Sequence, residues 1–173
     1  MAQGSMKTRV GVVIVLLVLP AAATAQVVTT LNPLYQQVKT FIVKSAEQMP
    51  EENYSFKPVP GVRSFGEIVG HLANENFEMC AAAKGEKRTM VQDFEKNTEK
   101  TALVKALTDA MAYCDPLYAM ADKAFGGSAE LFGMKMTRLG VLSMNVTHDW
   151  EHYGNFITYL RIKGLVPPSS QGN

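Results

Sequence analysis

The sequence predicts an all-α protein, a four-helix bundle preceded by a cleavable signal peptide, and three observations support this prediction. Four segments carry apolar residues at helical spacing, and none shows a convincing strand alternation. The chain has 173 residues, 47% of them hydrophobic, which suits one globular domain with a core. Its first 25 residues have the layout of a secretory signal. We therefore expect one bundle over residues 26–173.

The N-terminal segment has the three parts of a signal peptide. Two basic residues precede an apolar run at 10–19, and small residues fill 21–25. The run is shorter than the ~20 apolar residues of a membrane span. We therefore expect cleavage after Ala25, no stable membrane insertion afterwards, and a periplasmic or secreted protein. Residues 1–5 look like an added or upstream sequence before a native start at Met6.

The first two helices have recognisable start signals. Asn32 and Pro33 are expected to open the first helix, because Asn is a good N-cap and Pro is favoured at the first helical position. Ser64 and Glu67 form the sequence of a capping box at the start of the second helix. Gly85 is a natural C-terminal stop for that helix.

A polar, aperiodic connection at 86–98 leads to the other two helices. The third helix follows directly, and Pro116 falls inside its apolar pattern, where it should kink the helix. The fourth helix is expected from about Met134 to Lys163, with Gly164 closing it.

Three histidines are the candidates for chemistry. His148 and His152 are four residues apart, so their rings project from one face of the fourth helix, and His71 lies in the second helix. Imidazole is a common ligand of Zn, Ni, Cu and Fe. Three imidazoles leave coordination positions for water or substrate, as in catalytic sites. The pair alone is also compatible with histidines that only decorate a helix.

Polar residues extend the histidine face of the fourth helix at spacings of 3, 4, 3 and 4: Asn145, His148, His152, Asn155 and Tyr159. An exposed face would usually be rich in Lys and Glu, so this one indicates a pocket with ligands and hydrogen-bonding groups. Asp149 and Glu151 point away from it and are expected at the surface.

Charge and cysteine content restrict the function further. The formal net charge is +1 and no Lys/Arg stripe is present, which argues against a nucleic-acid partner. Cys80 and Cys114 do not form a CxxC motif. In an oxidising compartment they could form a disulfide or remain two buried thiols, and a catalytic cysteine is less favoured than either.

The chain resembles the DinB superfamily of bacterial four-helix metalloenzymes over nearly all of residues 31–170. The segments that carry the resemblance are YSFKP (54–58), RSFGEIVGHLA (63–73), HDWEHYGN (148–155), LR (160–161) and the closing GLVPPSS (164–170). The family's metal triad, one His in helix two and an HxxxH pair in helix four, falls on His71, His148 and His152.

The resemblance implies an up-down-down-up bundle in which helices two and three run parallel. The 86–98 connection would then be the long crossover that parallel neighbours require. Parallel helices also place Cys80 and Cys114 in matching halves, and this favours a disulfide between them.

Known members include thiol transferases that depend on a metal and a mycothiol-dependent maleylpyruvate isomerase. The resemblance therefore implies a divalent metal (Zn, Ni or Fe) that activates water or a thiolate. Glu75, one turn beyond His71, is a candidate hydrogen-bonding partner of a metal-binding histidine or a general base, with a solvated carboxylate as the alternative. Asn155 and Tyr159 are expected to line the pocket.

We therefore expect an exported metal-dependent hydrolase or transferase that acts on an unknown small substrate. Export separates the protein from the cytoplasmic thiol pool, which argues against thiol transfer. The alternatives are a non-catalytic metal-binding or stress-related bundle and an interaction module with packed histidines, which the intact triad disfavours. A homodimer is compatible with so small a bundle.

Overall fold

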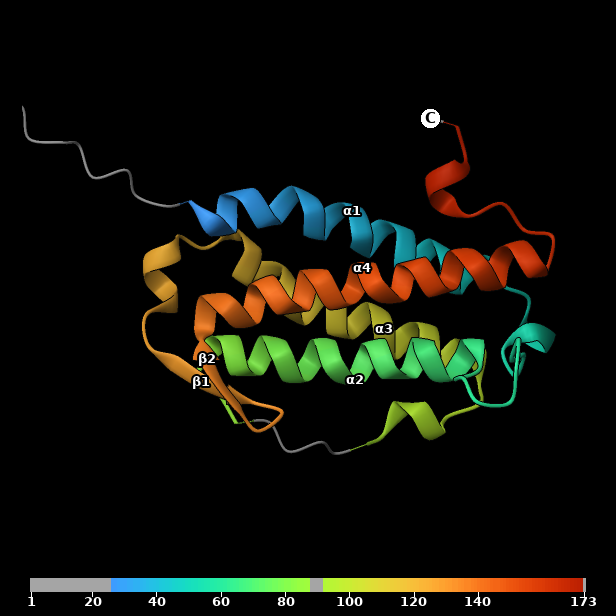
Figure 1. Cartoon of the computed structure of the whole chain (residues 1–173), viewed down its shortest axis with the longest axis horizontal. Coiled ribbons are helices and arrows are strands. Elements are labelled where there is room, and N and C mark those ends of the chain that lie inside the picture. Colours follow the sequence, from blue (N-terminus) through green and yellow to red (C-terminus); the bar gives the residue numbers. More distant parts are fainter. Residues whose placement is uncertain (1–25, 88–91, 173) are drawn as a thin grey trace, which may run out of the picture.

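The computed structural model describes residues 26–87 and 92–172. Four α-helices make up most of it: α1 (Val27–Gln48), α2 (Phe65–Lys84), α3 (Lys100–Cys114) and α4 (Arg138–Ile162). They pack lengthwise into one elongated bundle (Figure 1). The expected signal peptide, with its cleavage site after Ala25, lies outside the described residues. Among the described helices, none is long and apolar enough to cross a membrane.

Helix α1 begins at Val27, six residues before the expected first helical residue, Pro33, which lies inside it. The reason is a cap supplied from elsewhere in the chain. The carboxylate of Asp122 accepts hydrogen bonds from the backbone N–H groups of Val27 (2.8 Å) and Val28 (2.9 Å). Free N–H groups and a positive end of the dipole make a helix start a favourable place for a carboxylate. The prediction that Asn32 caps this helix is therefore wrong.

Helix α2 has the predicted ends. The Ser64 hydroxyl accepts from the Glu67 N–H, and the Glu67 carboxylate accepts from the Ser64 N–H at 2.6 Å, which completes the capping box. Gly85 adopts the left-handed conformation (φ 81°) that ends the helix.

Pro116 ends α3 instead of kinking it. The α-helix stops at Cys114, and the chain continues as a short 3-10 helix, Asp115–Ala119, with the proline near its start. Proline has no N–H to donate to the preceding turn, and its ring crowds that turn's carbonyl. The prediction of a kinked but continuous helix is therefore wrong.

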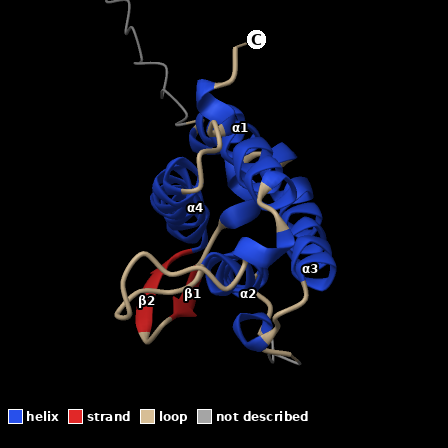
Figure 2. Ribbon diagram, turned by 90° about the vertical axis from the view of Figure 1, so that its right-hand side faces the viewer, coloured by secondary structure: helices blue, strands red, loops and turns tan. Residues whose placement is uncertain are grey.

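The structure contains a β-hairpin that the sequence did not indicate. Strands β1 (Ser128–Leu131) and β2 (Met134–Thr137) pair antiparallel and project from the side of the bundle (Figure 2). Phe132 (φ 51°) and Gly133 (φ 73°) form the two-residue turn. Strands of four residues are too short for a clear alternation. Helix α4 consequently begins at Arg138, four residues later than expected.

Helices α2 and α3 lie side by side and run in the same direction (Figure 1). Near their first turns, a Cβ atom on Gly66 would lie 3.4 Å from Cδ1 of Leu103. Near their last turns, the Cα atoms of Cys80 and Cys114 are 5.5 Å apart. The described part of the connection, around Phe94 and Glu95, lies against α2 next to His71.

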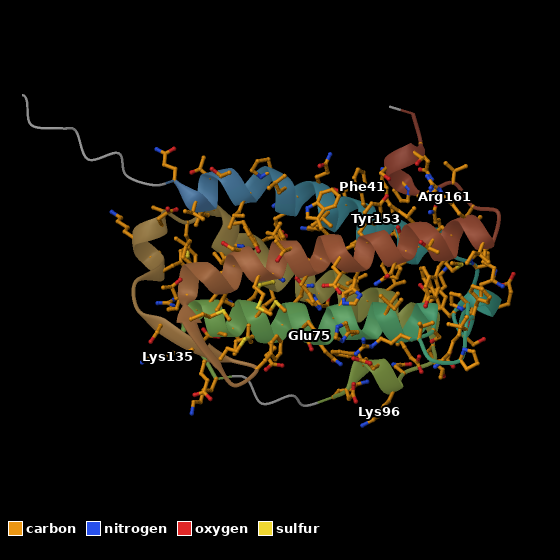
Figure 3. The ribbon with its side chains drawn as sticks, in the orientation of Figure 1. Phe41, Glu75, Lys96, Lys135, Tyr153 and Arg161 are labelled. Atoms are coloured by element: carbon orange, nitrogen blue, oxygen red, sulfur yellow. A yellow bond between two sulfur atoms is a disulfide. The ribbon has the colours of Figure 1, made fainter. Side chains whose placement is uncertain are left out.

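Helix α4 packs against both α1 and α2. It runs antiparallel to α2, so that Asn76 in the middle of α2 meets Asp149 in the middle of α4. Along α1, the rings of Phe41 and Tyr153 stack with centroids 5.0 Å apart (Figure 3). The apolar core between the helices includes these fully buried side chains: Tyr35, Ile42, Leu72, Leu107, Met111 and Phe156.

A candidate three-histidine metal centre

The three histidines meet between α2 and α4, as the family resemblance implied. Nε2 of His148 lies 3.2 Å from Nε2 of His71 and 3.1 Å from Nε2 of His152. The possible ligand atoms of all three side chains lie within 4.8 Å of one another. The antiparallel packing of α4 on α2 brings His71 to the HxxxH pair, and the helical repeat aligns the pair itself.

The two Nε2–Nε2 distances that involve His148 fit pairs of ligands on one divalent metal ion. Two nitrogen ligands at Zn–N bonds of about 2.05 Å and tetrahedral angles would be about 3.3 Å apart. Without a cation, each close Nε2–Nε2 pair can form a hydrogen bond only if one of its two nitrogens carries a proton. Two unprotonated nitrogens at this distance repel each other through their lone pairs, and a metal ion would remove that repulsion. Zn, Ni and Fe all accept imidazole ligands, so the donor set is compatible with each of these metals.

Groups at the opposite edges of two rings orient their ligand atoms. Nδ1–H of His71 donates to the Glu95 carboxylate at 2.7 Å, which leaves the Nε2 lone pair toward the centre. The Asn155 amide lies 3.2 Å from Nδ1 of His152 and can present its oxygen there by rotating half a turn. Nδ1 of His148 is buried without a hydrogen-bond partner among the described residues.

Glu95, not Glu75, makes the carboxylate contact to His71. The nearest Glu75 oxygen is 4.0 Å from Nδ1 of His71, against 2.7 Å for Glu95. Glu75 lies on α2 (Figure 3) with a side chain only 16% exposed. Burial and the nearby carboxylates of Glu78 and Glu95 raise the pKa of Glu75 to about 7. Glu75 thus lies behind the His71 ring, on the side away from the converging Nε2 atoms.

The sequence did not indicate Glu95 as a residue of the site, because Glu95 lies in the aperiodic connection at 86–98. A short 3-10 helix, Phe94–Lys96, carries it onto α2, where Asp93 and Phe94 bond to the Asn74 side chain. A carboxylate in a polar loop has no periodicity that would mark it. The residue that pairs with it, Arg63, did fall within one of the segments quoted for the family resemblance.

All three imidazoles favour the neutral form. Burial, followed by the mutual repulsion of the three rings, lowers the pKa of His148 to about 4. Burial also lowers the pKa of His152 to about 4 and depresses that of His71. The pKa of a histidine in water is about 6.5. The three rings are therefore unprotonated at neutral pH, as metal ligation requires.

A cleft of about 410 Å³ opens beside His152. Its walls come from the 58–63 connector, from α2 and from α4. Asn155 and Tyr159 line it as expected, and the Tyr159 hydroxyl donates to the Arg63 carbonyl at 2.5 Å. Glu151 is exposed, as predicted, but it also lines this cleft. A small molecule bound in the cleft would contact one of the three histidines.

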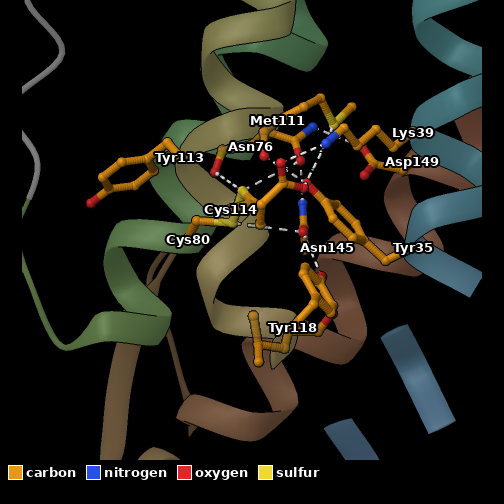
Figure 4. Close-up of a disulfide and its surroundings, with 12 residues drawn as sticks. Tyr35, Lys39, Asn76, Cys80, Met111, Tyr113, Cys114, Tyr118, Asn145 and Asp149 are labelled. Atoms are coloured by element: carbon orange, nitrogen blue, oxygen red, sulfur yellow. Dashed lines mark hydrogen bonds and ion pairs between the residues drawn. A yellow bond between two sulfur atoms is a disulfide. The ribbon is translucent and has the colours of Figure 1, made fainter. Parts of the chain in front are cut away.

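Two residues of α4, Asp149 and Asn145, lie in different surroundings from those that the sequence predicted. Asp149 was expected at the surface but is fully buried, and Asn145, expected in the pocket, is buried away from the cleft. Both bond to Asn76: its amide donates to Asp149 at 2.7 Å and accepts from Asn145 at 2.8 Å. Tyr118 adds a hydrogen bond to Asn145 at 2.7 Å (Figure 4). Asp149 was predicted to be exposed, but its side chain faces Asn76 on α2.

Cys80 and Cys114 form a disulfide next to this polar network (Figure 4). The bridge joins α2 to α3 across 34 residues of sequence. Both cysteines are fully buried, and Sγ of Cys114 lies 3.3 Å from the Asn76 carbonyl. The sequence left open a disulfide or two buried thiols, and the structure has the disulfide.

The sequence matches a known family. The sequence model of the DinB superfamily matches residues 35–155. The chain is 25% identical over 122 residues to the uncharacterized protein YjoA of Bacillus subtilis, which covers 69% of this chain and 79% of YjoA.

Solved structures share the fold. A DinB-like protein from Bacillus cereus superposes with a TM-score of 0.63 at 19% identity and covers 78% of this chain and 93% of its own. YfiT from Bacillus subtilis, described as a probable metal-dependent hydrolase with an unusual four-helix bundle topology, has a TM-score of 0.63 at 14% identity and covers 84% and 93%. The mycothiol-dependent maleylpyruvate isomerase has a TM-score of 0.61 at 13% identity; 77% of this chain matches 63% of that enzyme.

Proposed function

Because this chain belongs to the DinB superfamily, we propose that it is an exported metal-dependent hydrolase acting on a small substrate. His71, His148 and His152 hold one divalent metal, and the adjacent cleft holds the substrate. The observation that carries the proposal is the convergence of three neutral imidazole nitrogens beside that cleft. We also assign the bundle the up-down-down-up order, which the parallel packing of α2 and α3 supports.

The residues around the triad have separate tasks. A bound divalent metal supplies Lewis acidity and an acidified water at an open coordination position. Glu95 and Asn155 orient the rings of His71 and His152 from behind. For proton transfer we propose Glu151 ahead of Glu75, because Glu151 lines the cleft and Glu75 lies behind the His71 ring.

Two observations favour this function over its alternatives. A passive metal store needs no space beside its ligands, whereas here a cleft of about 410 Å³ adjoins the triad. The buried Cys80–Cys114 disulfide suits an oxidising compartment and supports a periplasmic or secreted location. In such a compartment the cytoplasmic thiols are absent, which favours hydrolysis over thiol transfer.

The test combines metal analysis with turnover. Protein purified without a histidine tag or chelators should contain close to one divalent metal per chain, and His148→Ala should lose it. Hydrolysis of a panel of small esters and amides should depend on the metal and vanish in His148→Ala, with the circular dichroism spectrum unchanged. A fully metal-loaded wild type that hydrolyses nothing on the panel would favour the non-catalytic metal-binding bundle.

A further inference from the structure

Among the residues that the structure describes, the cleft beside the triad has one cationic side chain, Arg63. The other charged residue in its described wall is Glu151, and the neutral polar lining comes from His152, Asn155 and Tyr159. Arg63 lies at the end of the connector that leads into α2, two residues before the helix begins. The side chain is 45% exposed, so it can meet a ligand that enters the cleft.

A single carboxylate holds Arg63 and a histidine of the triad. Glu95 accepts from Nε of Arg63 at 3.0 Å and from Nη2 at 3.5 Å, and it also accepts from Nδ1 of His71 at 2.7 Å. The guanidinium is therefore positioned relative to the metal ligands instead of swinging freely. A guanidinium has further N–H groups besides these two, and they remain for a ligand.

The positive charge of Arg63 reaches the whole triad. It contributes to lowering the pKa of each histidine, although burial contributes more. Because Glu95 contacts both Arg63 and His71, an anionic ligand held by this guanidinium would lie close to the His71 side of the triad.

The rest of the wall is apolar and contains branched or cyclic side chains: Pro58, Val59, Val62 and Ile68. Val59 is 56% exposed and Val62 is 40% exposed, so both apolar side chains are accessible to a ligand in the cleft. Exposed apolar side chains that gather around a cleft are typical of a ligand-contacting surface. They would cover a short alkyl or aryl body.

We propose that Arg63 binds a carboxylate of the substrate, and that the histidine site acts on small monocarboxylates with an apolar body. The substrate class rests on the proposed function, while the binding role of Arg63 does not. A monocarboxylate matches the one cation of the cleft in charge and the guanidinium in shape. A phosphate dianion would carry excess negative charge toward Glu151, so a carboxylate fits better.

Binding of a matched pair of probes tests the proposal in the whole chain. Phenylacetate and its neutral analogue phenylacetamide differ only in the charged group, and their affinities are measured by NMR titration. The titration uses protein treated with a chelator, so that a metal cannot bind the carboxylate. Phenylacetate should bind ~10-fold more tightly than the amide, the size of a charge-assisted hydrogen bond. Equal affinities would overturn the proposal without any variant.

Variants then assign the effect to one side chain. Arg63→Gln should remove the preference for phenylacetate and leave phenylacetamide binding unchanged, and Arg63→Lys should keep part of the preference. Arg161→Gln is the matched control, because it removes the same charge from α4 outside the cleft. Preference retained in Arg63→Gln, or carboxylate binding that appears only with zinc present, would overturn the role of Arg63.

The outcomes separate this inference from the proposed function. A chain that binds no metal but still prefers phenylacetate contradicts the metalloenzyme and leaves Arg63 as the carboxylate-binding residue. A chain that binds zinc at the triad without any preference for phenylacetate leaves the metal site standing and refutes the carboxylate assignment.

Discussion

Glu95 accepts a hydrogen bond from Nδ1–H of His71 at 2.7 Å, across 24 residues of sequence. Partners of this kind hold the ring of a metal ligand in one tautomer and orientation. We expect Glu95→Ala to weaken zinc binding roughly 10- to 100-fold, as measured by competition with a chromophoric chelator. Glu86→Gln changes a carboxylate elsewhere in the same connection and should leave the affinity unchanged. Equal zinc affinity in Glu95→Ala and wild type would show that this contact does not orient the ligand.

Gly70 should be intolerant of a side chain. A Cβ atom there would collide with the backbone carbonyl of Phe94 and lie 2.7 Å from the backbone nitrogen of Glu95. Gly70→Ala must push the 3-10 helix that carries Glu95 away from α2. We expect a loss of stability in urea denaturation together with weaker zinc binding.

The control for this substitution is Gly154→Ala in α4, where a Cβ atom would meet nothing within 4 Å. Alanine is the better helix former by ~1 kcal/mol, so this variant should be more stable than wild type and bind zinc normally. If Gly70→Ala behaved like Gly154→Ala, the close packing of the connection on α2 would be disproved.

Asp149 should make the stability of the metal-free protein depend on pH. Burial raises its pKa to about 7, well above its ordinary value of 3.8. The folded protein therefore holds this proton more tightly than the unfolded chain does. The stabilisation is fully present below pH 3.8 and is lost as the pH rises toward 7, by up to ~1.4 kcal/mol per pH unit.

Asp149→Asn removes this titration while it keeps the acceptor for Asn76. Its free energy of unfolding relative to wild type should increase between about pH 4 and 7 and then level off. Both proteins are measured with a chelator, so the histidines titrate alike and cancel. Asp109→Asn makes the same substitution at an exposed position of α3 and is the matched control. A flat curve for Asp149→Asn would mean that Asp149 is ionised throughout.

The disulfide should contribute substantially to stability. Closing a loop of 34 residues in the unfolded chain is worth ~3–4 kcal/mol in the chain-entropy model. We expect Cys80→Ala/Cys114→Ala to unfold at a clearly lower urea concentration than wild type. Wild type measured with dithiothreitol should approach the variant, and the variant should not respond to the reductant. Identical midpoints for all samples would show that the bridge adds no stability.

Local sequence patterns were sufficient to predict the ends of α2 and the shared face of His148 and His152. The capping box at Ser64 and the stop at Gly85 depend on groups a few residues apart, and α2 has the ends that they indicate. His148 and His152 share a face because the helical repeat places residues four apart in line. The family resemblance supplied the third partner, His71, which no local pattern connects to the pair.

Long-range contacts explain the errors. The Asp122 carboxylate caps the first N–H groups of α1, although it lies 94 residues from Val28 in the sequence. The helix therefore does not start at Asn32 and Pro33. Asp149 is polar and next to a histidine, but the amide of Asn76 on another helix makes its burial possible. Neither contact leaves a periodic trace in the sequence.

The primary structure was thus enough to predict the four helices and the His148–His152 pair, because helix periodicity, capping and i,i+4 spacing are local properties of the chain. Tertiary packing alone placed Glu95 and Arg63 beside the triad and buried Asp149 in a polar network. These positions depend on contacts between aperiodic segments and distant helices, and only the folded chain brings such groups together.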